Sequence, residues 1–235
     1  MSHSASLASR TGLWTAIALF VLEALYIGVL GIGLLTLPDP DTPIQNPWFT
    51  AMEILILCMA PLLVVLFICL HYRTKASRRP WSMAALGFML GLCILTTGLH
   101  FAILTLSWRS DFSEPPWSTL VFPFRWPSLA YAVDIVAWDI FWPLSLLCAA
   151  CALEHSRRQR WLKSFMLLSA LLSALGLLGV ALDDMDYRNI GIVGYVPVFM
   201  IVLALLIPFF RRGENNALEP PGPKKSDLNT TRAYE

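Results

Sequence analysis

The chain has 235 residues, of which 57% are hydrophobic and only 14% are charged, and its mean hydropathy is +0.63. Soluble domains carry about 25% charged residues, so this composition excludes an ordinary soluble domain. The formal net charge is +1, and the sequence has neither a basic stripe nor a glycine-rich phosphate loop. We therefore expect no nucleic-acid partner.

Six apolar stretches are each long enough to cross a membrane, for which about 18 consecutive residues suffice. Backbone groups in lipid must pair within their own helix or within a closed barrel. The alternating polarity that barrel strands require is absent, so we predict an all-α, six-helix transmembrane bundle. The predicted spans are residues 12–36, 48–72, 82–106, 128–153, 161–182 and 190–210.

The basic residues between the spans predict the orientation of the chain. Arginine and lysine gather in loops 73–80 and 154–163 and after the last span, at Arg211 and Arg212. The opposite loops are 38–47, 107–127 and 183–189. Basic loops stay in the cytosol, so we predict that both termini are cytosolic. The protein would lie in an endomembrane of a eukaryote, or in the inner or plasma membrane of a bacterium.

A single domain accounts for the chain. We predict a cytosolic N-terminus (1–11), a six-span transmembrane domain (12–210) and a disordered cytosolic tail (211–235), which is polar and rich in proline. The sequon that begins at Asn229 falls in this tail, so we expect it to carry no glycan. Residues 107–127 are rich in Trp, Phe and Pro, which is typical of a segment at the membrane interface.

The cysteine, histidine and lysine positions favour neither a cofactor nor a metal. All five cysteines, including the Cys148–Cys151 pair, fall inside predicted spans, where cysteine behaves as a small hydrophobic residue. Catalytic zinc needs about three protein ligands, and only His100 among four histidines lies well within a span. All four lysines lie in the loops or the tail, with Lys163 at the end of loop 154–163, which excludes a retinal Schiff-base lysine within the bundle. We expect membrane lipids and a hydrophobic small molecule as partners.

Several polar residues lie where lipid-facing positions should be apolar. Counted along each span, Glu23 and Asp139 fall near the midplane, and Glu53, His100, Asp134 and Tyr195 fall in the outer half. An acid at the centre of a span costs about 2.5–3.5 kcal/mol and usually faces the bundle interior or a wet cavity. We therefore predict that these side chains border one polar pocket among the first four helices, with Glu23 and Asp139 held as neutral acids. Glycines at 28, 31, 87, 91, 176 and 179 are predicted to let helices approach closely.

The fourth span contains "YAVDIVAWDIFWP", residues 131–143, with two acids among tryptophans. Tyr131, Asp134, Trp138 and Trp142 lie three or four residues apart and share one stripe of an α-helix. Asp139 lies about 140° round the helix from Asp134 and about 7.5 Å along it. We expect it to meet Glu23 or His100 of a neighbouring helix. Pro143 cannot donate to the carbonyl of Asp139 and is predicted to kink the helix there.

Three functions are compatible with this pattern. Each of them gives the buried acids a different role. They are hydrogen-bonded links in a structural or scaffold protein, proton donors in an enzyme, or coupling groups in a proton-coupled carrier. The carrier is favoured by the opposite orientation of spans 1–3 and 4–6. In the enzyme, a buried acid protonates a hydrophobic substrate and aromatic faces stabilise positive charge. Its candidate catalytic residues are Asp139, Glu23, Asp134 and His100, and its candidate substrate-binding residues are Trp138, Trp142, Tyr131, Glu53 and Tyr195.

The segment "AVDIVAWDIFW", the chain length and the short loops resemble the small integral-membrane terpene cyclases of fungal meroterpenoid pathways. This resemblance implies acid-catalysed cyclisation or isomerisation of a prenyl-type lipid, with Asp139 as the residue most like the family's acid. Those enzymes usually have seven spans, whereas six are predicted here. The segment also resembles uncharacterised small multi-pass membrane proteins of bacteria, for which no chemistry is implied.

Overall fold

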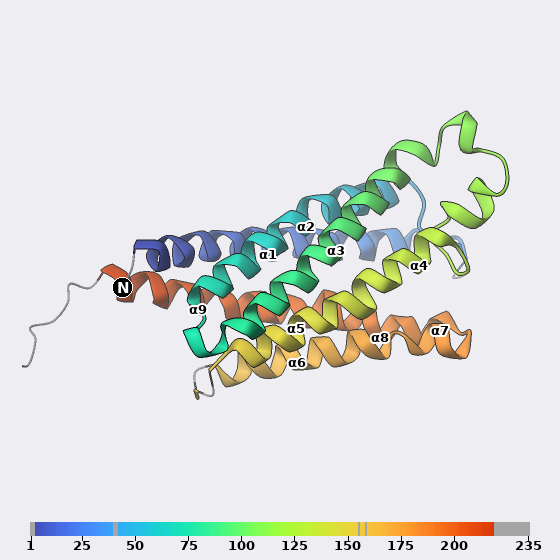
Figure 1. Cartoon of the computed structure of the whole chain (residues 1–235). Helices are drawn as coiled ribbons and strands as arrows, with labels where there is room; N and C mark the ends of the chain where they lie inside the picture. Colours follow the sequence, from blue (N-terminus) through green and yellow to red (C-terminus); the bar gives the residue numbers. More distant parts are fainter. Residues whose placement is uncertain (1–2, 40–41, 155, 158, 219–235) are drawn as a thin grey trace, which may run out of the picture.

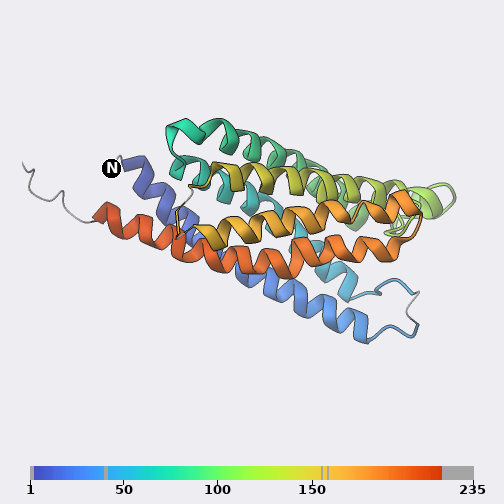
Figure 2. The same cartoon turned by 90° about the horizontal axis from the view of Figure 1, so that it is seen from below.

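The computed structural model describes residues 3–39, 42–154, 156–157 and 159–218, and all regular structure within them is helical. Six helical rods run side by side in an elongated bundle (Figures 1 and 2). All six are long and apolar enough to cross a membrane. The predicted all-α, six-helix architecture is confirmed at this level.

Three rods are single helices and three are built from consecutive segments. The first three are α1 (His3–Leu35), α2 (Trp48–Arg73) and α3 (Arg79–Leu106). The fourth joins α4 (Leu129–Ile135), η4 (Val136–Phe141) and α5 (Trp142–Ala152), and the fifth joins α6 (Arg160–Leu175) and α7 (Leu178–Leu182). The sixth joins α8 (Arg188–Val193), η6 (Gly194–Val198) and α9 (Phe199–Leu218). Short turns lie between them: η1 (Ala76–Arg78), η2 (Ser110–Phe112), η3 (Trp117–Val121) and η5 (Met185–Tyr187).

The ends of the rods agree with the predicted spans to within a few residues, with three exceptions. Helix α1 begins at His3, well before residue 12, and Ala5, Leu7, Ala8 and Arg10 are the good helix formers in this extension. The sixth span begins at Met185 instead of residue 190, so most of the predicted loop 183–189 is helical. Helix α9 continues to Leu218. The rest of the predicted tail, including Asn229, lies outside the described residues.

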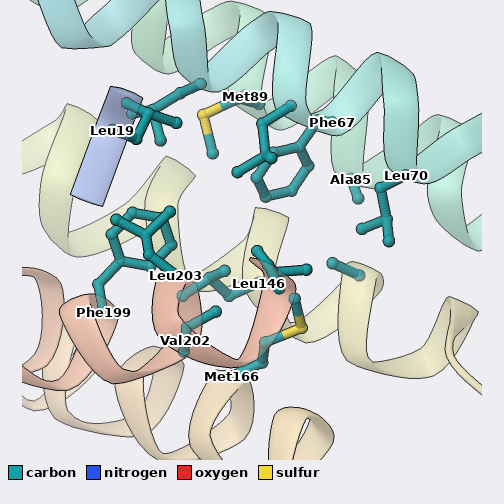
Figure 3. Packing of buried hydrophobic residues seen from close by; sticks show 14 of the residues in the cluster. Leu19, Phe67, Leu70, Ala85, Met89, Leu146, Met166, Phe199, Val202 and Leu203 are labelled. Atoms are coloured by element: carbon teal, nitrogen blue, oxygen red, sulfur yellow. The ribbon is translucent and has the colours of Figure 1, made fainter. Parts of the chain in front are cut away.

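Consecutive rods pack against one another, and α9 of the sixth rod packs on both α1 and α6. The six rods therefore form a closed ring around a common interior. The interior of the bundle, in the half of its length nearest the two basic loops, is filled by apolar side chains, including Leu19, Phe67, Met89, Leu146 and Phe199 (Figure 3). Close packing of such side chains stabilises the bundle through many van der Waals contacts. The other half of the bundle's length holds most of the buried polar side chains.

Glycine permits close contact at only some of the predicted positions. A Cβ added to Gly176 would lie 3.1 Å from the Cα of Gly191, and one added to Gly179 would lie 3.2 Å from the backbone nitrogen of Arg188. At Gly91 it would lie 3.0 Å from the ring of Phe141. The prediction is wrong for residues 28, 31 and 87, where nothing lies within 4 Å of an added Cβ. The contacts at Gly176 and Gly179 join the fifth rod to the sixth, next to the polar site, and the contact at Gly91 joins the third rod to the fourth.

Candidate functional site

A cavity of about 750 Å³ lies inside the bundle, in the half of its length away from the apolar core. Its walls come from the C-terminal half of α1, the N-terminal half of α2, the α4–η4 segment and the α8–η6 segment, and residues of loops 38–47 and 107–127 line its end. Most of the lining is apolar. The polar and aromatic groups in it include Glu23, Tyr26, Glu53, Tyr131, Asp134, Trp138, Arg188, Asn189 and Tyr195.

A chain of buried charged groups crosses the bundle beside this cavity. Glu53 Oε2 lies 2.7 Å from His100 Nδ1, and His100 Nε2 lies 3.4 Å from Asp134 Oδ1. Arg188 donates from Nη2 to Asp134 Oδ2, and from Nε to Asp139 Oδ2 at 3.3 Å. These five residues are at most 5% exposed. Buried charges persist when they are paired and hydrogen-bonded, and here the pairing joins four of the six rods.

Arg188 is the central residue that the sequence did not predict, because it falls in the expected loop 183–189. In the structure, Asp184 accepts a hydrogen bond from the backbone N–H of Asp186, which caps the turn η5. Helix α8 then begins at Arg188. The guanidinium carbon of Arg188 lies 4.2 Å from the ring centroid of Tyr131, a cation–π contact that is strengthened by desolvation. Arg188 is thereby held between the fourth rod and the sixth.

The two acids of the fourth rod share this arginine because the rod changes its winding between them. Residues 136–141 form a π-helical turn, closed by the N–H of Trp142 donating to the carbonyl of Ala137. The hydrogen bond of a π-turn spans five residues, one more than in an α-helix. Two residues that are five positions apart in the sequence therefore come closer to the same side of the rod. Asp134 and Asp139 therefore reach the same arginine, although an α-helical count sets them about 140° apart. Pro143 follows directly and has no N–H to give to Asp139, which favours the altered winding at this point.

Asp139 contacts Arg188, not Glu23 or His100 as expected. Its Oδ1 atom has no hydrogen-bond partner among the described residues. That oxygen lies 3.0 Å and 2.8 Å from where Cβ atoms would stand on Gly176 and Gly191. Only glycine leaves room for the carboxyl group at this crossing. Asp139 thus lies outside the cavity lining, between the fourth, fifth and sixth rods.

The remaining predicted site residues divide into two groups. Glu23, Glu53, Asp134, Tyr131, Trp138 and Tyr195 line the cavity. His100 lies behind the wall, between Glu53 and Asp134. Trp142 is fully buried beneath Trp138 and donates from Nε1 to Ser169 Oγ at 3.2 Å. The expectation that His100 and Asp139 border the pocket together with Glu23 and Asp134 therefore fails.

Glu23 differs from the other buried acids in its surroundings. It is 6% exposed and lines the cavity, and no hydrogen bond or ion pair reaches it from any residue that the structure describes. Tyr26, which the sequence did not single out, follows one turn along α1 and interacts electrostatically with Glu23, Glu53, Asp134 and Arg188. The unpartnered carboxyl and the charged chain therefore face the same space.

The cavity combines a mostly apolar lining with carboxyl, phenol and guanidinium groups. Within the described part of the chain, no group of three His, Cys, Asp or Glu side chains is arranged to hold a metal ion. Protein-family models, curated proteins and solved structures were all compared with the chain, and none of them matches it.

Proposed function

We propose that the protein is an integral membrane protein with cytosolic termini, and that its cavity opens towards the non-cytosolic side. Large apolar side chains such as Trp14, Leu35 and Ile94 are exposed along the rods, as lipid-facing residues would be. The basic loops 73–80 and 154–163 lie at the end away from the cavity, which supports this orientation.

Single cysteines placed in the three loops near the cavity test the orientation. We expect residues in 38–47, 107–127 and 183–184 to react with a membrane-impermeant maleimide in intact cells. Residues in 73–80 should react only after the membrane is opened. The reverse pattern would contradict the proposed orientation without altering the fold.

We further propose that the cavity carries out acid-catalysed isomerisation or cyclisation of a prenyl-type lipid. The observation that carries this proposal is Glu23, a buried carboxyl without a protein partner in an apolar, aromatic-lined cavity. Its volume of about 750 Å³ falls within the range of about 300–1,000 Å³ that is usual for sites of drug-sized ligands. An acid that lacks a cationic partner in such surroundings is favoured in its neutral, proton-donating form.

The proposed reaction assigns a separate role to each group. Glu23 gives its proton either to an alkene carbon, where the π electron pair forms the new C–H bond, or to an epoxide oxygen. In the epoxide a lone pair on oxygen accepts the proton, and the C–O bond then breaks with its electron pair moving to oxygen. The resulting cation closes a ring or shifts, while the faces of Tyr26, Trp138 and Tyr195 stabilise its charge. Loss of a proton from carbon to the carboxylate of Glu53 or Asp134 then forms the product. No oxidant is required, because product and substrate are isomers.

The charged chain would hold the accepting groups in place. His100 lies between the two carboxylates, with Nδ1 2.7 Å from Glu53 Oε2 and Nε2 3.4 Å from Asp134 Oδ1, and would keep both at the cavity wall. Asp139 keeps Arg188 positioned on Asp134. This role differs from that of a proton-donating acid, which the resemblance to terpene cyclases implies for Asp139.

Product formation in deuterated water is the experiment that tests the proposal. Membranes containing the protein are given a panel of prenylated phenols and their epoxides, and products are analysed by mass spectrometry. We expect an isomer of one panel member, with a single deuterium on carbon when an alkene is protonated. Conversion without deuterium incorporation from an alkene would contradict the acid mechanism. A panel that stays unchanged would favour the structural role, in which the charged chain only ties the rods together.

A further inference from the structure

The balance of charge around the cavity leaves room for a cation. The cavity and the chain beside it contain four carboxyl groups, those of Glu23, Glu53, Asp134 and Asp139. One guanidinium and one imidazole lie among them, and both are already engaged: Arg188 with two aspartates and His100 with Glu53 and Asp134. Even a cationic His100 leaves more acid than base. Buried charge must be paired or neutralised.

Glu23 is the group at which this excess is located. The other three acids each contact a cationic or titratable side chain, whereas Glu23 has no such contact among the described residues. The protonated Glu23 carboxyl is neutral and adds no negative charge to the cavity. A ligand that brings a positive charge would allow it to ionise, because an ammonium and a carboxylate in a dry site neutralise one another.

The aromatic side chains of the lining suit the same kind of ligand. Tyr26, Trp138 and Tyr195 line the cavity, and the rings of Trp138 and Tyr195 lie 5.1 Å apart. Tyrosine and tryptophan faces attract alkylammonium groups, most strongly when the cation is desolvated. Tyr131 is already used by Arg188. The apolar residues around Ile44, Phe49 and Ile192 offer the remaining surface to a hydrocarbon tail.

We infer that the cavity binds lipophilic tertiary amines as ammonium ions, with Glu23 as their counter-ion. This inference deepens the proposed function and rests on it for the direction of proton transfer. The amine nitrogen takes the proton from the Glu23 carboxyl through its lone pair, which yields an ammonium beside a carboxylate. An alkene or epoxide would accept the same proton and react onward, whereas the amine stops at the ion pair. The expected substrates are therefore lipids on whose hydrocarbon tail a positive charge develops during the reaction.

Equilibrium binding of a tritiated probe to the full chain in lipid nanodiscs tests the inference. The probe is N,N-dimethylfarnesylamine, and farnesyl methyl ether serves as its neutral competitor. Empty nanodiscs give the contribution of partitioning into lipid. We expect the amine to bind the parent protein about tenfold or more tightly than the ether. Equal affinity for amine and ether would overturn the inference, and this comparison needs no variant.

Glu23→Gln should remove the preference for the amine, because glutamine keeps the size of the side chain but cannot form the carboxylate. The matched control is Glu114→Gln, which makes the same change at an exposed position and should leave the preference unaltered. A preference that persists in a folded Glu23→Gln protein would overturn the assignment of the counter-ion. Amine binding that depends on Glu23 without turnover of any alkene would refute the proposed reaction only. Turnover without amine preference would refute the present inference only.

Discussion

Replacing Arg188 with methionine is expected to lower the free energy of unfolding by about 3–5 kcal/mol, the usual cost of removing one partner from a buried ion pair. Arg188 is 3% exposed and is the cation that contacts both Asp134 and Asp139. Methionine keeps the unbranched apolar stem of arginine, but it is shorter and donates no hydrogen bond. Two aspartates would then be left facing each other without a guanidinium. Thermal unfolding in detergent, followed by circular dichroism, measures the change.

The same substitution at Arg109 is the control for loss of an arginine. Arg109 is exposed after the end of α3, so Arg109→Met should change stability by no more than about 0.5 kcal/mol. A second variant, Arg188→Met with Asp139→Asn, should regain part of the lost stability, because one unpaired carboxylate is gone. An Arg188→Met protein that melts like the parent would contradict the importance of the charged chain for the fold.

The number and the approximate positions of the spans were predictable from the sequence because their signal is local. A run of about 20 apolar residues identifies a span without knowledge of its neighbours, and six such runs become the six rods. Interior polar side chains were predictable for a related reason. An acid such as Glu23 or Asp134 is too costly to leave in lipid, so it had to face inward, and both are indeed buried and line the cavity.

The partners of these acids were not predictable, since two deviations from ideal geometry decide them. An α-helical count separates Asp134 from Asp139 by about 140°, and the π-turn at residues 136–141 removes that separation. Arg188 stands among aspartates in "DDMDYRN" and was assigned to a loop. The one available signal was charge balance. Four acids in the spans needed a cation, and Arg188 directly precedes the apolar run "NIGIVGYV".

Replacing Glu23 with glutamine is expected to reduce turnover of a prenylated substrate by about 10²–10⁴-fold, the range that positioned acid–base groups contribute. The amide fills the same place in the cavity wall but has no acidic proton to give. Because Glu23 has no ion pair or hydrogen bond to lose among the described residues, the melting temperature should stay close to that of the parent. The measurement is product formation and thermal unfolding of the same purified variant.

Asp139→Asn is the comparison that separates two possible proton donors. Asp139 does not line the cavity, and asparagine can still accept the hydrogen bond from Arg188 Nε through its amide oxygen, in the narrow space beside Gly176 and Gly191. We expect this variant to keep its activity to within about tenfold, which corresponds to about 1.4 kcal/mol in the barrier. An inactive Asp139→Asn protein together with an active Glu23→Gln protein would exclude Glu23 as the donor. The acid would then be Asp139, acting from behind the cavity wall, as the resemblance to terpene cyclases implies. A loss of activity in the glutamine variant alone would assign proton donation to α1, where the carboxyl of Glu23 faces the substrate space directly.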